Sequence, residues 1–265
     1  MIELGLEGRA AFVAGGSRGI GKAIALALAG EGVKVAISAR GKEELEQTAR
    51  ELNSIAGNQV LSVQADMTAA EDIKRFVKSA ADSFGRIDIL AYCANTPGGG
   101  KFSEITDEAW CHHLDVKLMG CIRCVREVIP YMSRNHWGRI VIISGTSARE
   151  LRPKNVDNGP ICAALSNFGK QVSNELAPSG ITVNTIHPCS TNTRRHQIRV
   201  ERQARECGLT VQEFLDQELS RFPIGRIIEP QDITNLTLFL CSKGSSAITG
   251  KSIAVDGGQT TAINY

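Results

Sequence analysis

The sequence contains few aromatic residues, no long hydrophobic run and almost no excess of charge of either sign. Only 5% of the 265 residues are aromatic, and just three are tyrosines. No apolar stretch reaches the roughly 18–20 residues that a membrane-spanning helix needs. The formal net charge of +2 gives no reason to expect a nucleic acid or a membrane surface as a partner. The 42% of hydrophobic residues is enough for one large core.

The signals of a secreted or metal-binding protein are missing as well. The N-terminal segment MIELGLEGRAAF carries acidic residues where a signal peptide would be basic. The eight cysteines are scattered, which suits a reducing compartment better than a disulfide framework. Cys121 and Cys124 form a C-x-x-C pair without a second pair of ligands nearby, so we expect buried thiols and no metal site. We therefore expect a cytoplasmic protein.

Apolar, β-branched runs alternate with helical stretches along the whole chain, and no repeat, low-complexity segment or linker interrupts them. This alternation predicts a three-layer, doubly wound parallel sheet of the α/β (Rossmann) type, with residues 1–265 in a single domain. One long irregular region, Ser190–Pro223, is where a lid over a substrate cleft would fit. The predicted strands are Ala10–Ala14, Lys34–Ser38, Gln59–Gln64, Ile87–Cys93, Gly138–Ser144, Thr182–His187 and Ser252–Val255. The predicted helices are Lys22–Gly30, Lys42–Ala56, Ala70–Phe84, Asp107–Arg134, Ala163–Ala177 and Pro230–Cys241.

A glycine-rich turn lies between the first predicted strand and the first predicted helix. In the segment AFVAGGSRGIGKAIA, Gly15, Gly19 and Gly21 form a G-x-x-x-G-x-G pattern. Such glycines let the backbone approach a pyrophosphate, whose charge then sits on the helix N-terminus. Glycine turns also occur for packing reasons alone, but the strand, turn and helix around this one favour a dinucleotide cofactor.

The segment AGGSRGIGKAIA resembles the coenzyme motif of the short-chain dehydrogenase/reductase family. Asn174–Pro188 and Phe222–Gly258 are similar to that family's C-terminal signatures, so the resemblance runs over essentially the whole chain. It implies that Asp66 lies beside the adenine ring and that Thr193 binds the nicotinamide carboxamide. The cofactor-binding residues that it implies are Gly15, Ser17, Arg18, Gly19, Ile20, Gly21, Arg40, Asp66, Met67, Ala94, Pro188 and Thr193.

The choice of cofactor depends on the residues after the second predicted strand. An acidic residue there would bind a ribose 2′-hydroxyl and repel a 2′-phosphate. This chain has Ala39 followed by Arg40, and Arg18 lies in the glycine turn. Two guanidinium groups near one ribose suit a 2′-phosphate, so we predict NADP(H). The alternative is that both are ordinary surface arginines.

The resemblance also implies a catalytic set of asparagine, serine, tyrosine and lysine, which this chain does not have. Counting back from the E-L-A element that starts at Glu175 places the tyrosine position at Asn158 and the lysine position at Cys162. The serine position is Gly145, and the asparagine position is Lys117. All four residue types are replaced, so we predict an atypical site.

Three nearby residues are candidates to substitute for the missing groups. Lys117 could place an ammonium in the space left by the missing lysine, or it could extend to solvent. Ser144, next to Thr146 and Ser147, could polarise a carbonyl, or simply end a strand. Tyr92 could face the cofactor, or pack as a ring beneath it.

Other polar residues near the predicted site have plainer interpretations. We interpret Cys162 as a buried, inert thiol, because no base is placed beside it by the sequence. His112 and His113 are expected at the surface or in an interface. Arg149, Arg152 and Lys154 lie in the loop that would wall the substrate pocket.

These observations predict an NADP(H)-dependent oxidoreductase with a non-standard active site. Reduction of a conjugated C=C bond, or of a carbonyl activated by Lys117, fits the residues better than ordinary ketone reduction. Arginines of the segment 194–206 could steer an anionic substrate such as an acyl thioester, or form a solvated helix face. The rival hypotheses are a non-redox lyase or isomerase that keeps the cofactor, and a catalytically silent NADP(H)-binding partner subunit. By resemblance we expect a homo-oligomer, in first place a homotetramer.

Overall fold

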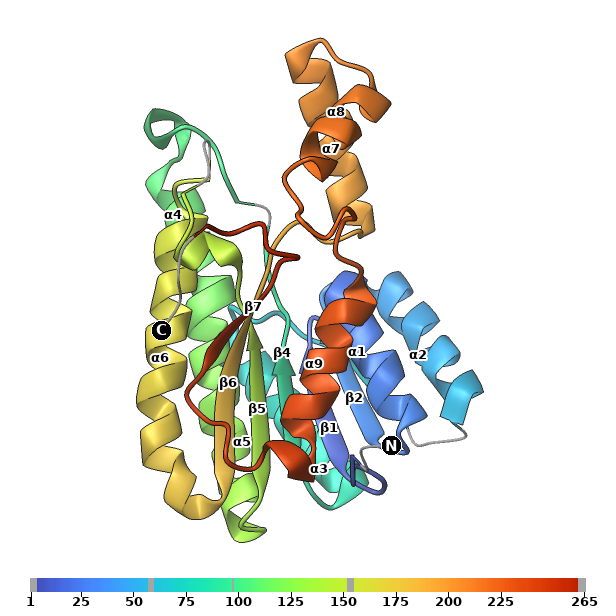
Figure 1. Ribbon diagram of the computed structural model, residues 1–265. Coiled ribbons are helices and arrows are strands. Elements are labelled where there is room, and N and C mark those ends of the chain that lie inside the picture. The colour runs from blue at the N-terminus through green and yellow to red at the C-terminus, as the bar shows by residue number, and fades with distance from the viewer. Residues whose placement is uncertain (1–3, 57–59, 97, 152–154, 262–265) are drawn as a thin grey trace.

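A seven-stranded parallel sheet forms the centre of the α/β fold, seen in the computed structural model in Figure 1. The structure describes residues 4–56, 60–96, 98–151 and 155–261. The strands have the order β3-β2-β1-β4-β5-β6-β7. They are β1 (Ala10–Ala14), β2 (Lys34–Ala39), β3 (Val60–Gln64), β4 (Ile89–Tyr92), β5 (Gly138–Ile143), β6 (Ile181–Pro188) and β7 (Ser252–Val255). The predicted fold class is confirmed, and the strand bounds differ from the predicted ones by at most two residues among the described residues.

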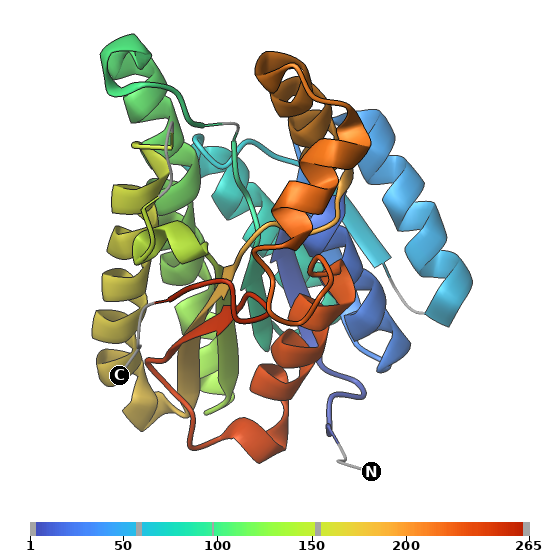
Figure 2. The ribbon, with the colours of Figure 1, turned by 45° about the horizontal axis from the view of Figure 1, so that its top comes forward.

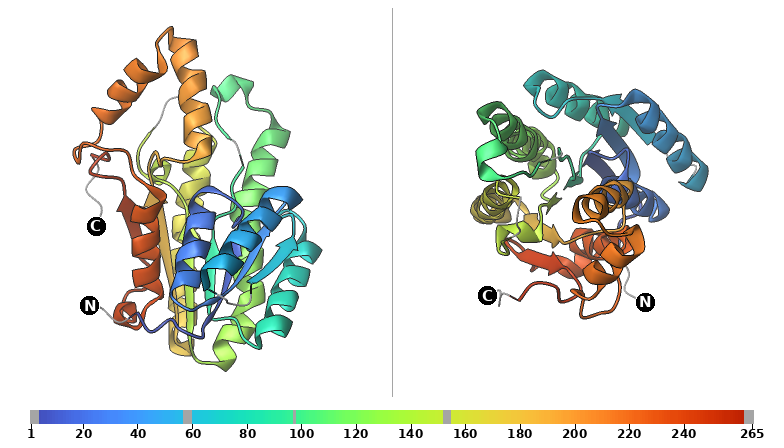
Figure 3. Two further views of the ribbon diagram at one scale, coloured as in Figure 1. Left: turned by 90° about the vertical axis from the view of Figure 1, so that its right-hand side faces the viewer. Right: turned by 90° about the horizontal axis from the view of Figure 1, so that it is seen from above.

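Helices cover both faces of the sheet, as the view from above in Figure 3 shows. One face carries α1 (Gly19–Gly30), α2 (Lys42–Ala56) and α9 (Pro230–Cys241). The other carries α3 (Ala70–Phe84), α5 (Gly120–Arg134) and α6 (Asn158–Leu176). Side chains alternate along β1: Phe12 packs with the α3 side, and Val13 packs with the α1 side. This alternation buries both faces, which is why the strands read as almost continuous apolar runs.

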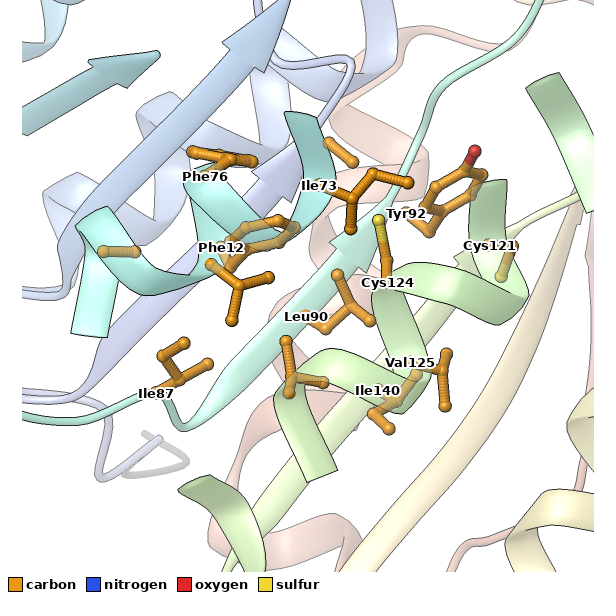
Figure 4. Close-up of a cluster of buried hydrophobic side chains, with 14 of the residues drawn as sticks. Phe12, Ile73, Phe76, Ile87, Leu90, Tyr92, Cys121, Cys124, Val125 and Ile140 are labelled. Carbon is orange, nitrogen blue, oxygen red and sulfur yellow. The ribbon is translucent and has the colours of Figure 1, made fainter. Parts of the chain in front are cut away.

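The core on the α3 side is closed by aromatic packing. The ring centroids of Phe12 and Phe76 lie 3.9 Å apart, and both rings are inaccessible to solvent. Figure 4 shows this cluster, with Leu90 and Val125 extending it toward α5. Replacing a buried phenylalanine by alanine typically costs ~3–5 kcal/mol. The sheet is therefore a rigid base for the loops at its carboxyl edge.

The region Ser190–Pro223 was predicted to be irregular, and this prediction is wrong. It folds into α7 (Arg194–Cys207) and α8 (Val211–Leu219), which rise above the carboxyl edge of the sheet in Figures 1 and 2. Thr193 caps α7 by accepting a hydrogen bond from the His196 N–H, and Thr210 and Glu213 form a capping box at α8. These capping residues start two helices in the region, and the alternative weighed for segment 194–206, a solvated helix face, agrees with α7.

The predicted helix Asp107–Arg134 is one continuous stretch with a widened turn in it. The segment α4 (Asp107–Leu114) passes into a π-helical turn (Asp115–Met119), which passes into α5. π turns of this kind are frequent at functional sites. Lys117 lies in the middle of the π turn, so the distortion falls on one of the candidate residues. No helix in the described part of the chain is long and apolar enough to cross a membrane.

Candidate active site

The glycine-rich turn leaves no room for side chains where its backbone comes closest to the end of β4 and to itself. Gly15 has a φ of 77°, and a Cβ on it would lie 2.8 Å from the backbone nitrogen of Ala94. A Cβ on Gly21 would lie 2.2 Å from the Gly15 carbonyl oxygen. The turn is also fixed to α2, because the Thr48 hydroxyl donates to the Ser17 carbonyl at 2.8 Å. These contacts hold the turn against the end of β4, with the N-terminus of α1 beyond it.

The start of α7 lies opposite the glycine turn. Gly19 has a φ of 56°, and a Cβ on it would lie 3.6 Å from Thr193 Cγ2. The glycine turn and the capping residue of α7 therefore face each other closely. Pro188 ends β6 beside them, and Ile20 packs against the apolar core on the α1 side. The structure thus gathers these predicted cofactor residues at the carboxyl ends of β1, β4 and β6, where α/β sheets bind ligands.

A hollow of about 360 Å³ opens beside the ends of β2 and β3, lined by Arg40 and Asp66. Asp66 Oδ1 accepts hydrogen bonds from the Thr68 N–H and hydroxyl, both at 2.9 Å. Arg75 also lines the hollow, and its guanidinium was not singled out from the sequence. Met67, by contrast, turns its side chain into the core. The hollow therefore has two guanidinium groups and two carboxylates. Arg75 pairs with Asp72 at 2.8 Å, and Asp66 is the carboxylate expected beside an adenosine end.

Arg18 does not line this hollow. Its side chain is 74% exposed, and its Nη1 lies 3.4 Å from Glu44 Oε2. Arg18 instead lies near Arg195 of α7: burial lowers the pKa of Arg195, and the charges of Arg18 and Arg199 lower it further. Arg195 also donates to the Thr96 carbonyl at 3.2 Å, which ties the α7 helix to the loop after β4. The two predicted arginines, Arg18 and Arg40, therefore lie at different parts of the cleft.

Lys117, Gly145, Asn158 and Cys162 lie together, although they come from three elements. Lys117 is 2% exposed, and its Nζ donates to Asn158 Oδ1 at 2.7 Å and to Cys162 Sγ at 3.1 Å. A Cβ on Gly145 would lie 3.4 Å from the same Sγ atom. Lys117 is thus a buried side chain and not one that extends to solvent. We call these four residues the lysine cluster.

Hydroxyl groups surround the lysine cluster. The Ser144 hydroxyl donates to the Cys162 carbonyl at 3.2 Å, and Ser144 is 9% exposed. The Asn158 amide donates to the Ser147 hydroxyl at 3.2 Å. No carboxylate in the described ranges lies within ion-pair distance of Lys117 Nζ, which has only an amide oxygen and a sulfur as partners. The cluster therefore holds an ammonium whose charge is balanced by no direct anionic contact.

Tyr92 is placed away from the cleft, which corrects the hypothesis that it could act in catalysis. Its side chain is fully buried, and its hydroxyl donates to the Val116 carbonyl. Figure 4 shows the ring in the apolar cluster beside Cys121 and Cys124. Burial raises the pKa of Tyr92 well above its usual range. The plainer alternative, a packed ring, is the arrangement that the structure has.

A buried histidine–aspartate pair lies beside the lysine cluster, and this corrects the expectation that His113 is at the surface. His113 Nδ1 lies 2.7 Å from Asp157 Oδ2, and each side chain is 3% exposed. Asp157 carried no signal in the sequence, because a lone aspartate before a helix is common. His187, in contrast, is held by the Gly145 carbonyl at 2.8 Å and the Ser166 hydroxyl at 3.1 Å.

Part of the predicted substrate loop can be placed. Arg149 is exposed, whereas Arg152 and Lys154 lie outside the described residues. Within α7, Arg199 is used internally, because its Nη2 contacts Glu218 Oε1 at 2.5 Å. His196 Nε2 also contacts this carboxylate, at 2.9 Å. Arg199 of α7 therefore pairs with Glu218 of α8, whereas Arg195 of α7 contacts the loop after β4.

The glycine turn lies at the carboxyl edge of a doubly wound sheet, and the hollow lined by Arg40 and Asp66 opens beside it. This arrangement defines a dinucleotide-binding class of α/β protein. The sequence model of the family described as enoyl-(acyl carrier protein) reductase matches residues 14–260. The chain belongs to the short-chain dehydrogenase/reductase family.

Relatives in this family have similar lengths and known structures. A 3-oxoacyl-[acyl-carrier-protein] reductase FabG of Staphylococcus epidermidis is 29% identical over 94% of this chain and 98% of its own length. The structure of an actinorhodin polyketide ketoreductase variant with NADPH matches with a TM-score of 0.92 and 29% identity, covering 96% of this chain and 98% of that one. L-sorbose reductase from Gluconobacter frateurii, complexed with NADPH and L-sorbose, matches with a TM-score of 0.94 and 29% identity over 99% and 100% of the two chains.

Proposed function

We propose that this protein is an NADP(H)-dependent reductase in which the lysine cluster stands where related enzymes keep their asparagine, serine, tyrosine and lysine. The observation that carries the proposal is the buried ammonium of Lys117, 2.7 Å from Asn158 Oδ1 and 3.1 Å from Cys162 Sγ. Burying a cation without a carboxylate partner is costly, so a buried ammonium at this edge of the sheet favours a chemical role. The names of the relatives, which are ketoacyl and sugar reductases, support a carbonyl substrate.

The described residues fit a dinucleotide. Gly15 and Gly21 lie where any Cβ would clash, so the turn stays close to the end of β4 and leads directly into the N-terminus of α1, where a pyrophosphate would bind. Arg40 lines the hollow in which an adenosine 2′-phosphate would be neutralised, whereas the neighbouring Arg75 is paired with Asp72 at 2.8 Å. Thr193 faces the turn from α7, where a nicotinamide carboxamide would be held. When bound, the reduced nicotinamide supplies a hydride to an electrophilic carbon.

Lys117 has the right form to polarise the substrate. An ammonium has three N–H donors, of which Asn158 and Cys162 take two. The third donor can bind a substrate oxygen and stabilise the negative charge that develops on it. The same polarisation activates a ketone or a C=C bond conjugated to a carbonyl. We place the ketone of a 3-oxoacyl thioester first, because a 3-oxoacyl reductase and a polyketide ketoreductase are among the relatives named above. An anionic carrier would also be attracted by Arg195 and Arg18.

Two broader features belong to the same proposal. The eight thiols are all free, which supports the reducing environment of a cytoplasm. Two outer helices, α5 and α6, cover the same face of the sheet (Figure 1), and we propose that they meet a second copy in a homotetramer. A lid role for α7 and α8 would place the Ser190–Pro223 region over the substrate.

The proposal is tested by binding and turnover measured separately. NADPH fluorescence titration tests the cofactor site without any substrate. Oxidation of NADPH is then followed with acetoacetyl-coenzyme A, crotonyl-coenzyme A and L-sorbose. Consumption of NADPH with at least one of them supports the reductase. Tight NADPH binding without any consumption would favour the silent binding protein, and substrate conversion without net NADPH loss would favour a lyase or isomerase.

A further inference from the structure

His113 and Lys117 contact two neighbouring residues at the start of α6. His113 Nδ1 lies 2.7 Å from Asp157 Oδ2, and one residue further on Asn158 Oδ1 accepts from Lys117 Nζ at 2.7 Å. Residues four apart lie on the same side of a helix. The two contacts therefore lie side by side between the start of α6 and the helical stretch that α4 forms with the π turn. Lys117 and Asn158 of the lysine cluster therefore lie beside the histidine–aspartate pair.

The pair leaves one polar atom without a partner. His113 Nε2 is buried and makes no hydrogen bond, while Nδ1 donates to the Asp157 carboxylate. A neutral imidazole that donates from Nδ1 has a bare acceptor at Nε2. An unsatisfied buried acceptor typically costs ~1–3 kcal/mol. Such a group indicates that a hydrogen-bonding ligand atom belongs there.

The groups around His113 are known from each packed element. Asp157 lies at the start of α6, Lys117 on the same helical stretch as His113, and Arg195 on α7. Burial lowers the pKa of His113, and the hydrogen bond with Asp157 partly opposes this effect. The charges of Lys117 and Arg195 lower the same pKa further. Asp157 is held on its other oxygen by the Gly99 N–H at 2.9 Å. Burial alone would raise the pKa of Asp157, but these hydrogen bonds outweigh it, so this pKa is lowered. The carboxylate thus stays charged and orients the ring.

We propose that His113, oriented by Asp157, is the residue that gives the proton to the substrate oxygen, while Lys117 stays charged and holds that oxygen. This inference rests on the proposed reductase. The carbonyl carbon gains the hydride supplied by the reduced cofactor, and the oxygen gains the proton that leaves Nε2. The C=O double bond becomes a C–O single bond, the cofactor is oxidised, and solvent returns one proton to His113. In the reverse direction the bare Nε2 accepts the proton of the alcohol.

The arrangement divides the two tasks of the missing tyrosine–lysine pair. A group that transfers protons needs a pKa near the working pH, and imidazole is the side chain whose ordinary pKa lies there. Because Asp157 occupies Nδ1, only Nε2 is free to exchange a proton. Reduction requires the protonated ring, so its rate should fall as the pH rises through the lowered pKa of His113. Alcohol oxidation should rise over the same range.

The test uses three variants of the full chain: His113→Gln, Asp157→Asn and, as a matched control, His112→Gln. His112 is exposed on the same helix, so its loss reports on charge and helix effects alone. Histidine NMR of the protein without substrate gives the tautomer and the titration of His113. The pH profile of kcat/KM for NADPH oxidation with acetoacetyl-coenzyme A, or with whichever carbonyl compound of the panel turns over, gives the kinetic role. NADPH affinity is measured for every variant.

We expect His113 to titrate below pH 6.5 as the Nδ1–H tautomer. His113→Gln should lower kcat/KM at least ~100-fold, remove its dependence on pH and leave NADPH affinity unchanged. Asp157→Asn should lower kcat/KM by a smaller factor. His112→Gln should match the wild type. Turnover by His113→Gln with the wild-type pH limb would overturn the role of His113 and leave the reductase intact. A neutral ring that carries its single proton on Nε2, with Nδ1 bare toward Asp157, would also overturn it. A wild-type protein that binds NADPH but reduces no carbonyl in the panel would overturn both.

Discussion

Lys117 and Asn158 are 41 residues apart in the chain, yet Lys117 Nζ lies 2.7 Å from Asn158 Oδ1. The contact joins the π turn to the first residue of α6. It holds a long, buried, charged side chain in one position without help from any carboxylate in the described ranges. Since the desolvation of an ammonium is costly, this contact has consequences for stability as well as for chemistry.

The first prediction concerns the stability cost of the buried ammonium. Lys117→Met keeps most of the side-chain volume and removes the charge. Replacing buried ionic groups by apolar residues of similar volume is often neutral or stabilising. We expect the thermal midpoint of Lys117→Met to equal or exceed that of the wild type, measured by calorimetry in the absence of NADPH. A drop of more than ~2 kcal/mol in unfolding free energy would mean that Lys117 is a structural anchor.

The second prediction concerns the choice of cofactor. NADPH should bind at least ~10-fold more tightly than NADH, which corresponds to about 1.4 kcal/mol. Arg40→Ala should remove most of this difference, because Arg40 lines the hollow. Arg18→Ala is the comparison: its guanidinium lies near Glu44 and is largely exposed, so it should leave the preference nearly unchanged. Equal binding of both cofactors by the wild type, in fluorescence titrations, would refute the assignment.

The third prediction concerns acid stability of the α7–α8 region. Burial would raise the pKa of Glu218, but hydrogen bonds and charges of His196 and Arg199 lower it to about 2. The folded pKa lies below the unfolded one, so this carboxylate contributes stability above about pH 4.5, lost as the pH falls toward 2. The contribution is on the order of 3 kcal/mol. Hydrogen exchange in α7 should accelerate over this range in the wild type, and Glu218→Gln should lack the dependence.

The fourth prediction concerns assembly. If α5 and α6 pack against a second copy, light scattering at micromolar concentration should give the mass of a homotetramer, or at least of a dimer. Charge reversal at an exposed position of α5, such as Arg126→Glu, should shift the mass downward while the circular dichroism spectrum stays the same. Arg50→Glu on α2, far from that face, is the control. A monomeric wild type would contradict the proposed assembly.

The sequence was sufficient for the features that depend on local patterns. The glycine turn, the six predicted helical stretches and all seven strands follow from periodicity and from turn residues, because neighbouring residues specify them. The grouping of Gly15, Thr193 and Pro188 follows from the parallel topology, which brings the carboxyl ends of strands together.

The features that were missed depend on contacts between distant segments or on small polar signals. His113 and Asp157 are 44 residues apart, and nothing local distinguishes a buried histidine of a polar helix from an exposed one. The direction of Tyr92 was also beyond local patterns, since either face of β4 is apolar. For α7, a helix face over segment 194–206 was weighed, but its bounds and the helix α8 were missed, although Thr193, Gly208 and the Thr210–Glu213 capping box were readable.

The central claim is that Lys117 activates the substrate of an NADPH-dependent reductase. The most direct measurement is kcat for NADPH oxidation, under saturating NADPH and the best carbonyl substrate of the panel, for wild type, Lys117→Met and Cys162→Ser. Our account predicts a loss of at least ~100-fold for Lys117→Met with NADPH affinity reduced no more than a few-fold, and near wild-type turnover for Cys162→Ser. A Lys117→Met protein with wild-type kcat would contradict the account.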